Sequence, residues 1–119
     1  MVTAEQIKEL QDRVSTLERW LDIAKKREVV AEKQQQSLAP DFWDDAKAAE
    51  AFLKEMNAVK AWVLQYDATN SAVEDLDVLM ELDPEGEDID IAYADALSKI
   101  EDLELKNMLG GEGDNLGAV

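Results

Sequence analysis

The side chains that could do chemistry in this chain are almost all carboxylates. Of the 119 residues, 28 are Asp or Glu and 12 are Lys or Arg, and there is no Cys or His. This inventory excludes disulfides, thiolate zinc sites and nucleophilic catalysis that depends on Cys or His. Neighbouring carboxylates such as Asp44 and Asp45 remain, but nothing in the sequence predicts the secluded cleft that acid–base catalysis needs. We therefore predict that the chain is not an enzyme, with no catalytic residue and no cofactor.

The segment closest to a metal-binding loop is EGEDIDI, residues 85–91. It lacks the Gly and the closing Glu at the spacing of a calcium loop. Di-iron bundles of the familiar type need a Glu-x-x-His pair, which a chain without His cannot supply. We expect no metal site.

The acidic charge is unevenly distributed along the chain. The formal net charge is −16. Residues 1–36 hold seven basic and seven acidic side chains, whereas residues 37–119 hold 5 basic and 21 acidic ones. This charge disfavours extensive contact with a phosphate backbone, and the short basic run KKR, residues 25–27, is predicted to be a solvated face. The acidic part is either a set of solvated helix faces or a docking face for a basic protein partner.

The aromatic pair in APDFWDD, residues 39–45, predicts a structural corner. Pro40 disfavours helical geometry at the preceding residue, so a first helix should end near Ser37. We expect Phe42 and Trp43 to clamp the corner by packing on a residue inside the next helix, which Asp41 or Asp44 would cap. We favour this structural role over a ligand site. The other two tryptophans, Trp20 and Trp62, should be partly buried.

Apolar side chains that recur at spacings of three and four predict the helices that position these residues. A first helix over 3–36 should start with a capping box of Thr3 and Gln6 and should kink or lose burial near Asp22. Its inward residues would be Ile7, Leu10, Val14, Leu17, Leu21 and Ala24, followed by a weaker row of Glu28, Ala31 and Gln35.

Two further helices are predicted after the corner. The second has the inward residues Ala49, Phe52, Met56, Val59, Val63 and Tyr66, and then Val73, Leu76, Leu79 or Met80, and Leu82. Residues 67–71, DATNS, could either break it or lie within it. DPEG, residues 83–86, predicts a reversal. Asp88 or Asp90 would cap a last helix that buries Ile89, Tyr93, Leu97, Ile100, Leu103 and Met108 and ends at Gly110 and Gly111.

These patterns predict an all-α chain, a long antiparallel, coiled-coil-like helical bundle of three to four helices. We expect residues 1–109 to form the bundle domain and residues 110–119 to be a linker and the start of a missing following domain. No apolar stretch is long enough for a membrane span, and the first residues lack the features of a signal peptide, so we expect a cytoplasmic location without membrane contact.

Four segments resemble the amino-terminal helical domain of the bacterial release factor 2 family of translation termination factors. They are ERWLDIAKK (18–26), LAPDFWDDAKAAE (38–50), KEMNAVKAW (54–62) and EDLELKNMLGGEGD (101–114). The resemblance runs along nearly the whole chain. It implies a fragment of a factor that recognises the stop codons UGA and UAA on the ribosome and triggers hydrolysis of peptidyl-tRNA.

The resemblance also implies which parts of that function are missing here. The Ser-Pro-Phe codon reader and the Gly-Gly-Gln loop of the family do not occur in these 119 residues. The mRNA stop codon and the peptidyl-tRNA would therefore be contacted only through missing domains. This fragment would position the factor through ribosomal protein contacts, with basic proteins near the stalk base as the expected partners.

A different class of protein is compatible with the residues alone. A free-standing acidic coiled-coil scaffold, or a chaperone-like module that binds proteins, would have the same apolar spacing. Such a module would form stable homo-oligomers, whereas the sequence leaves the oligomeric state open.

Overall fold

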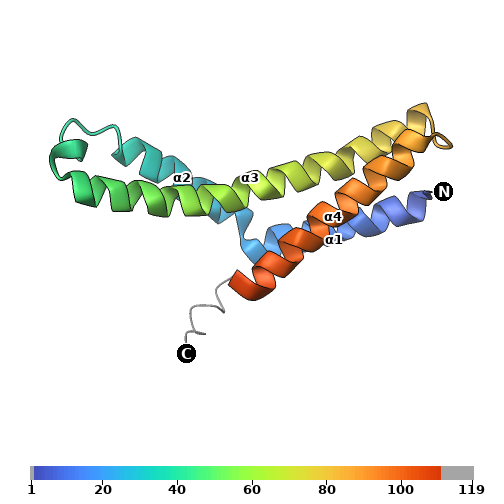
Figure 1. Ribbon diagram of the computed structural model, residues 1–119, viewed down its shortest axis with the longest axis horizontal. Coiled ribbons are helices and arrows are strands. Elements are labelled where there is room, and N and C mark those ends of the chain that lie inside the picture. The colour runs from blue at the N-terminus through green and yellow to red at the C-terminus, as the bar shows by residue number, and fades with distance from the viewer. Residues whose placement is uncertain (1, 111–119) are drawn as a thin grey trace. The chain divides into compact units, whose positions relative to one another are not determined.

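The computed structural model describes residues 2–110 and is all-α within that range. Four α-helices and a short 3-10 helix follow one another, with no strand in the described residues: α1 (Ala4–Leu21), α2 (Ile23–Gln36), η1 (Phe42–Asp44), α3 (Ala46–Leu82) and α4 (Glu87–Gly110) (Figure 1). The predicted all-α helical bundle is confirmed. None of these helices combines the length and the apolar character needed to cross a membrane.

The helices divide into two compact units. Among the described residues, the first unit comprises 2–21 and 66–110, and the second comprises 22–65. Helix α3 is continuous and belongs to both units. Its first half is part of the second unit, and its second half is part of the first unit. The predicted domain bounds of 1–109 and 110–119 remain a prediction, because residues 111–119 lie outside the described part of the chain.

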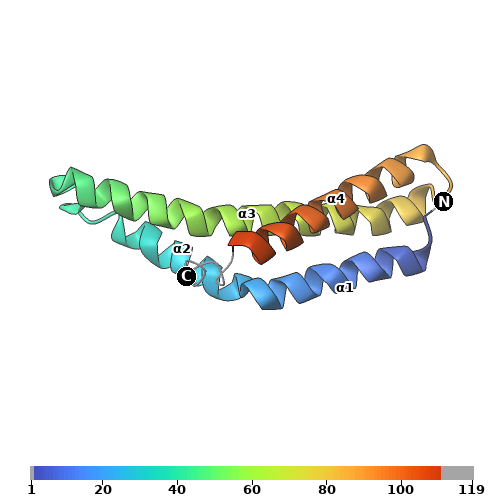
Figure 2. The ribbon, with the colours of Figure 1, turned by 60° about the horizontal axis from the view of Figure 1, so that its bottom comes forward.

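The first unit packs three helical segments around one apolar seam. In Figures 1 and 2, α1 and α4 run in the same direction and the second half of α3 runs in the opposite one. The predicted seam of α1 is confirmed up to Leu21, since Ile7, Leu10, Val14, Leu17 and Leu21 are all buried. The other buried members of the unit are Val2, Tyr66, Thr69, Val73, Leu76, Ile89, Ala96, Ile100 and Leu103. The burial of these apolar side chains is the main favourable term in the stability of the unit.

The start of α1 and the turn before α4 form as the sequence predicts. The Thr3 backbone N–H donates to Gln6 Oε1 at 2.8 Å, and the Gln6 N–H donates to Thr3 Oγ1 at 3.2 Å, which is a reciprocal capping box. At residues 83–86, the Gly86 N–H donates to the Asp83 carbonyl at 3.2 Å. A Cβ at position 86 would collide with the Asp83 carboxylate, so the turn favours glycine there.

Asp22 separates α1 from α2 and changes the register of the buried side chains. Its backbone is left-handed, with φ 50° and ψ 57°, which confirms the predicted kink. The prediction that Ala24 points inward is wrong, because Ala24 is exposed and Ile23 is buried instead. One left-handed residue interrupts the helical period, so the row Glu28, Ala31 and Gln35, which was counted onward from Leu21, is also exposed. The half-buried side chains of α2 are Lys26, Val29, Val30 and Lys33.

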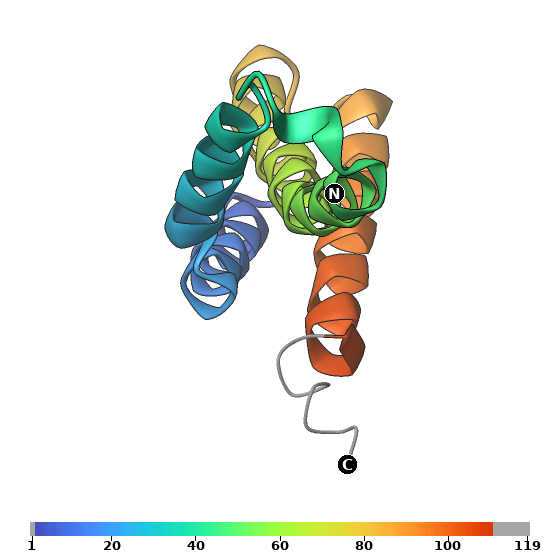
Figure 3. The same ribbon diagram turned by 90° about the vertical axis from the view of Figure 1, so that its left-hand side faces the viewer.

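The second unit joins α2 to the first half of α3 through the aromatic corner. The two helices lie side by side in Figure 3, and the Lys33 Nζ–Glu55 Oε1 ion pair of 3.1 Å connects them. Ala49, Met56 and Val63 of α3 are buried, and Phe52 and Val59 are half-buried, as predicted. Residues 67–71 continue the helix, with the Thr69 side chain buried. The sequence had left this point open.

Three predictions near helix ends are wrong. Leu82 and Met108 are exposed, because each lies in the last turn of its helix. Asp88 and Asp90 do not cap α4, because the helix begins at Glu87 and includes both. As acidic residues in a first turn, they still interact favourably with the positive end of the helix dipole.

Candidate functional site

The aromatic corner is a structural feature built by the residues of η1. The Phe42 ring lies edge-on to Trp43 and to Phe52, with centroids 5.3 Å apart in both pairs. Phe42 is half-buried, which confirms its predicted role. Trp43 is 61% exposed, so the clamp consists of Phe42 and Phe52 rather than of both corner aromatics.

Asp45 caps α3 in place of the predicted Asp41 or Asp44. Its Oδ1 accepts a hydrogen bond from the Ala48 N–H at 3.1 Å. The physical reason is the 3-10 turn, which occupies residues 42–44 and delays the α-helix until Ala46. Trp43 lies beside an open hollow of about 320 Å³ with Ala46, Lys47, Glu50 and Leu53. The corner therefore leaves an exposed aromatic face next to the start of α3.

Basic side chains in the second unit lie over aromatic rings. Lys33 Nζ is 4.6 Å from the centroid of Phe52, and Lys26 Nζ is 5.8 Å from that of Trp62. Trp62 is half-buried, as predicted. Within the run KKR, Lys25 and Arg27 are exposed, so Lys26 alone departs from the predicted solvated face. These contacts stabilise the pairing of α2 with α3.

The two units differ sharply in charge. The described residues of the first unit hold 18 acidic and 5 basic side chains, a net charge of −13, while the second unit holds 8 and 7. Residues 61–98 include 11 acidic side chains and no Lys or Arg. The acidic surface foreseen from the sequence therefore belongs to the first unit. We call the exposed residues Asp75, Glu81, Asp83, Glu85, Glu87, Asp88 and Asp90 the acidic face.

The acidic face consists of solvated side chains and has no bound-ion geometry. Among residues 2–110, no group of three or more Asp and Glu side chains is arranged to hold a metal ion. This includes the segment EGEDIDI, residues 85–91. The carboxylates of the acidic face produce a negative electrostatic potential that decays over a distance set by the ionic strength. Exposed apolar side chains accompany it, with Val78, Leu82 and Ile91 more than half exposed.

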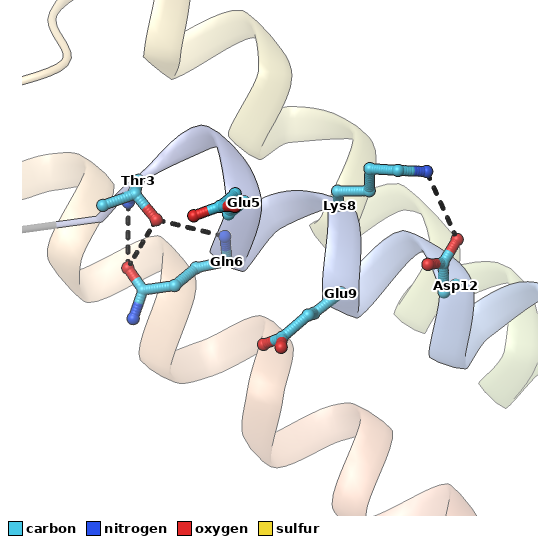
Figure 4. A pocket seen from close by; sticks show the side chains of 6 residues that line it. All are labelled: Thr3, Glu5, Gln6, Lys8, Glu9 and Asp12. Carbon is cyan, nitrogen blue, oxygen red and sulfur yellow. Dashed lines mark hydrogen bonds and ion pairs between the residues drawn. The ribbon is translucent and has the colours of Figure 1, made fainter.

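The start of α1 bears a second, mixed-charge surface. Thr3, Glu5, Gln6, Lys8, Glu9 and Asp12 line an open hollow of about 420 Å³. In Figure 4, Thr3 and Gln6 turn toward each other and Lys8 turns toward Asp12, 3.9 Å away. These polar side chains pair with their neighbours along one helix. The capping box and an i,i+4 ion pair therefore account for their arrangement.

The sequence reasoning missed two features of the first unit. Arg13 forms a two-point ion pair with Glu104 of α4, with Nη2–Oε1 at 2.6 Å and Nε–Oε2 at 3.0 Å. The hydrogen bond that Arg13 donates to Glu104, more than any other influence, raises the pKa of Arg13. Trp20, predicted to be partly buried, is 67% exposed and lies beside this pair. No spacing rule links residues 91 positions apart, so no sequence signal could have found the pair.

The chain is similar in sequence to proteins of known function. No protein-family model matches the chain. The chain is similar to curated proteins named peptide chain release factor 2 from three bacteria. It is 30% identical to the protein of Streptomyces avermitilis over 123 residues, which cover 98% of this chain. It is 33% identical to that of Tolumonas auensis and 35% identical to that of Aeromonas hydrophila, each over 114 residues, which cover 91% of this chain. The match covers 33%, 31% and 31% of those proteins, so the chain spans about a third of the length of the relatives it matches. The chain is thus related to the peptide chain release factor 2 family over nearly all of its own length.

Proposed function

We propose that this chain is the amino-terminal helical part of a translation termination factor that recognises the stop codons UGA and UAA. The observation that carries the proposal is the match of 91–98% of the chain to proteins named peptide chain release factor 2. Its own contribution would be to position the factor in the ribosome, which places it in the cytoplasm. Residues 110–119 would lead into a following domain.

The acidic face supports a positioning role that works through protein rather than RNA. A net charge of −13 on the first unit repels ribosomal RNA and attracts basic ribosomal proteins, such as those we expect near the stalk base. Stop-codon reading and peptidyl-tRNA hydrolysis would depend on parts of the factor outside these 119 residues. We infer that the chain by itself is not an enzyme.

The proposal is tested by co-sedimenting the purified 119-residue chain with ribosomes. We expect weak binding that decreases with salt, together with no peptidyl-tRNA hydrolysis in a purified release reaction. The variant Asp75→Asn/Glu81→Gln/Glu85→Gln removes three charges of the acidic face and should weaken binding at least about threefold. The matched control Glu28→Gln/Glu32→Gln/Glu50→Gln removes three exposed charges of the second unit and should bind like the unmodified chain.

Two results would count against the proposal. Release activity of the isolated chain would show that the fragment is not limited to positioning. Equal weakening by both triple variants would show that overall charge, and not the acidic face, governs binding. The alternative of a free-standing scaffold or chaperone-like module predicts no binding to ribosomes and stable homo-oligomers in solution.

A further inference from the structure

Large apolar side chains are exposed where α1 and α4 end. Trp20 is near the end of α1, and Leu105, Met108 and Leu109 belong to the last two turns of α4. We call these four residues the apolar end. Both helices finish at the same end of the first unit in Figures 1 and 2. Each of the four side chains is more than half exposed, and Met108 reaches 74%.

The apolar end adjoins the seam between α1 and α4. The Arg13–Glu104 pair joins α1 to α4, and an open hollow of about 230 Å³ lies beside it. Leu17, Trp20, Thr16 and Asp12 line the hollow together with the pair. Trp20 follows Arg13 by two turns on α1, and Met108 follows Glu104 by one turn on α4. The hollow therefore leaves room for a side chain from another segment beside Trp20.

This end of the unit is electrically balanced, unlike the rest of it. Residues 13–21 and 99–109 hold four basic and four acidic side chains. The remaining described residues of the unit carry its whole net charge of −13. Trp20, Met108 and Arg13 are of residue types that are enriched at the centres of protein interfaces.

We propose that the apolar end is an interdomain interface, covered by part of the release factor chain that lies outside the third matched here. This inference rests on the proposed function. The matched relatives are about three times as long as the aligned region, so a covering segment has ample chain to come from. Helix α4 ends at Gly110, directly after Leu109 of the apolar end, so a covering segment further along the parent chain would be tethered close by and would dock at a high effective concentration. The region around the apolar end has no net charge to attract a diffusing partner, so the covering segment needs this proximity.

The test compares the full-length parent protein with the 119-residue chain by hydrogen exchange. We expect residues 13–21 and 99–109 to exchange at least about tenfold more slowly in the full-length protein. Trp20→Lys should abolish that difference. The control Leu82→Lys, at an equally exposed leucine far from the apolar end, should preserve it. Circular dichroism of both variants checks that the helices remain folded.

A second measurement does not depend on a charge being tolerated at position 20. Trp43→Phe/Trp62→Phe leaves Trp20 as the single tryptophan of the 119 residues. Any tryptophan in the rest of the full-length protein is changed to Phe as well, so that iodide quenching reports the exposure of Trp20 alone. We expect the quenching constant in the full-length protein to be less than about half of that in the 119-residue chain, since a covered indole is shielded from the ion.

The outcomes separate this inference from the proposed function. Equal exchange and equal quenching in both proteins, in a parent that contains the Gly-Gly-Gln loop, would overturn the interface and leave the proposed function standing. A parent gene without any further coding sequence would overturn both. Self-association of the 119-residue chain that Trp20→Lys abolishes would assign the apolar end to a second copy and would also overturn the inference.

Discussion

Arg13 and Glu104 form a two-point ion pair between α1 and α4, although 91 positions separate them in the sequence. The guanidinium fork matches the carboxylate, so the pair fixes both the distance and the orientation of the two helices. Both side chains are about one third exposed, at 37% and 34%. Solvent therefore screens the pair, and its main contribution is to specify how the helices align.

A double-mutant cycle with Arg13→Gln and Glu104→Gln should give a coupling energy of about 0.5–1.5 kcal/mol, as expected for a partly exposed, two-point ion pair. The coupling energy should fall in about 1 M salt, because ions screen the pair. The Lys8–Asp12 pair is the control, since it is 3.9 Å long and mostly exposed, and should give less than about 0.5 kcal/mol. Urea unfolding measures both. Equal couplings in the two cycles would contradict the role assigned to Arg13.

The pH dependence of the same coupling follows from the raised pKa of Arg13. A cation with a raised pKa contributes stability that is complete below its unfolded pKa and is lost only as the pH rises through the folded value. That window lies in strongly alkaline solution, so the coupling should be constant from about pH 6 to about pH 10. A decline between about pH 8 and pH 10 would mean that another group controls the pair.

Leu17→Ala should lower the free energy of unfolding by about 2–5 kcal/mol, because the side chain is only 1% exposed and its loss leaves a cavity in the first unit. Leu82→Ala removes the same atoms from a side chain that is 75% exposed and should cost less than about 0.5 kcal/mol. Thermal or urea unfolding followed by circular dichroism compares the two. Similar costs at both sites would refute the register described for α1.

Asp45→Ala should destabilise the second unit by about 0.5–2 kcal/mol, since it removes the acceptor for the Ala48 N–H at the start of α3. Asp44→Ala removes an equal charge one residue earlier, where no cap is made, and should have a smaller effect. Hydrogen exchange in the first turn of α3 gives a local readout. A larger effect at Asp44 would restore the cap that the sequence predicted.

Asp22→Val should cost about 1–2 kcal/mol, because a β-branched residue is strained in the left-handed region that Asp22 occupies. Asp22→Gly should be neutral or stabilise by up to about 1 kcal/mol, because glycine adopts this conformation without a steric penalty. The two unfolding curves provide the measurement. If the valine variant is as stable as the glycine variant, α1 and α2 form one continuous helix.

The sequence predicted most of the helices and much less of their ends. Apolar spacing located the buried faces of α1, α3 and α4, because helix periodicity and burial are coupled along the chain. It failed after Leu21, where a single left-handed residue moved burial from Ala24 to Ile23. No local pattern shows when Asp takes that conformation.

Predictions at the corner and at the helix ends depended on geometry that spacing does not contain. The APDFWDD motif indicated a corner, yet the 3-10 turn transferred the cap to Asp45 and left Trp43 exposed. Met108 continues an apolar row past the point where the unit covers it, and Trp20, which was expected to be partly buried, is exposed as well. The sequence shows the excess of acidic residues directly. It does not show that most of the negative charge lies in one unit, because this depends on how α3 is divided between the two units.

The sequence of the parent gene beyond the codon for Val119 decides whether these helices are part of a termination factor. We predict that the frame continues into a region that encodes a Ser-Pro-Phe codon reader and a Gly-Gly-Gln loop, which would make these helices the positioning part of a termination factor. A native stop codon directly after Val119 would contradict this account and would leave a free-standing acidic helical module.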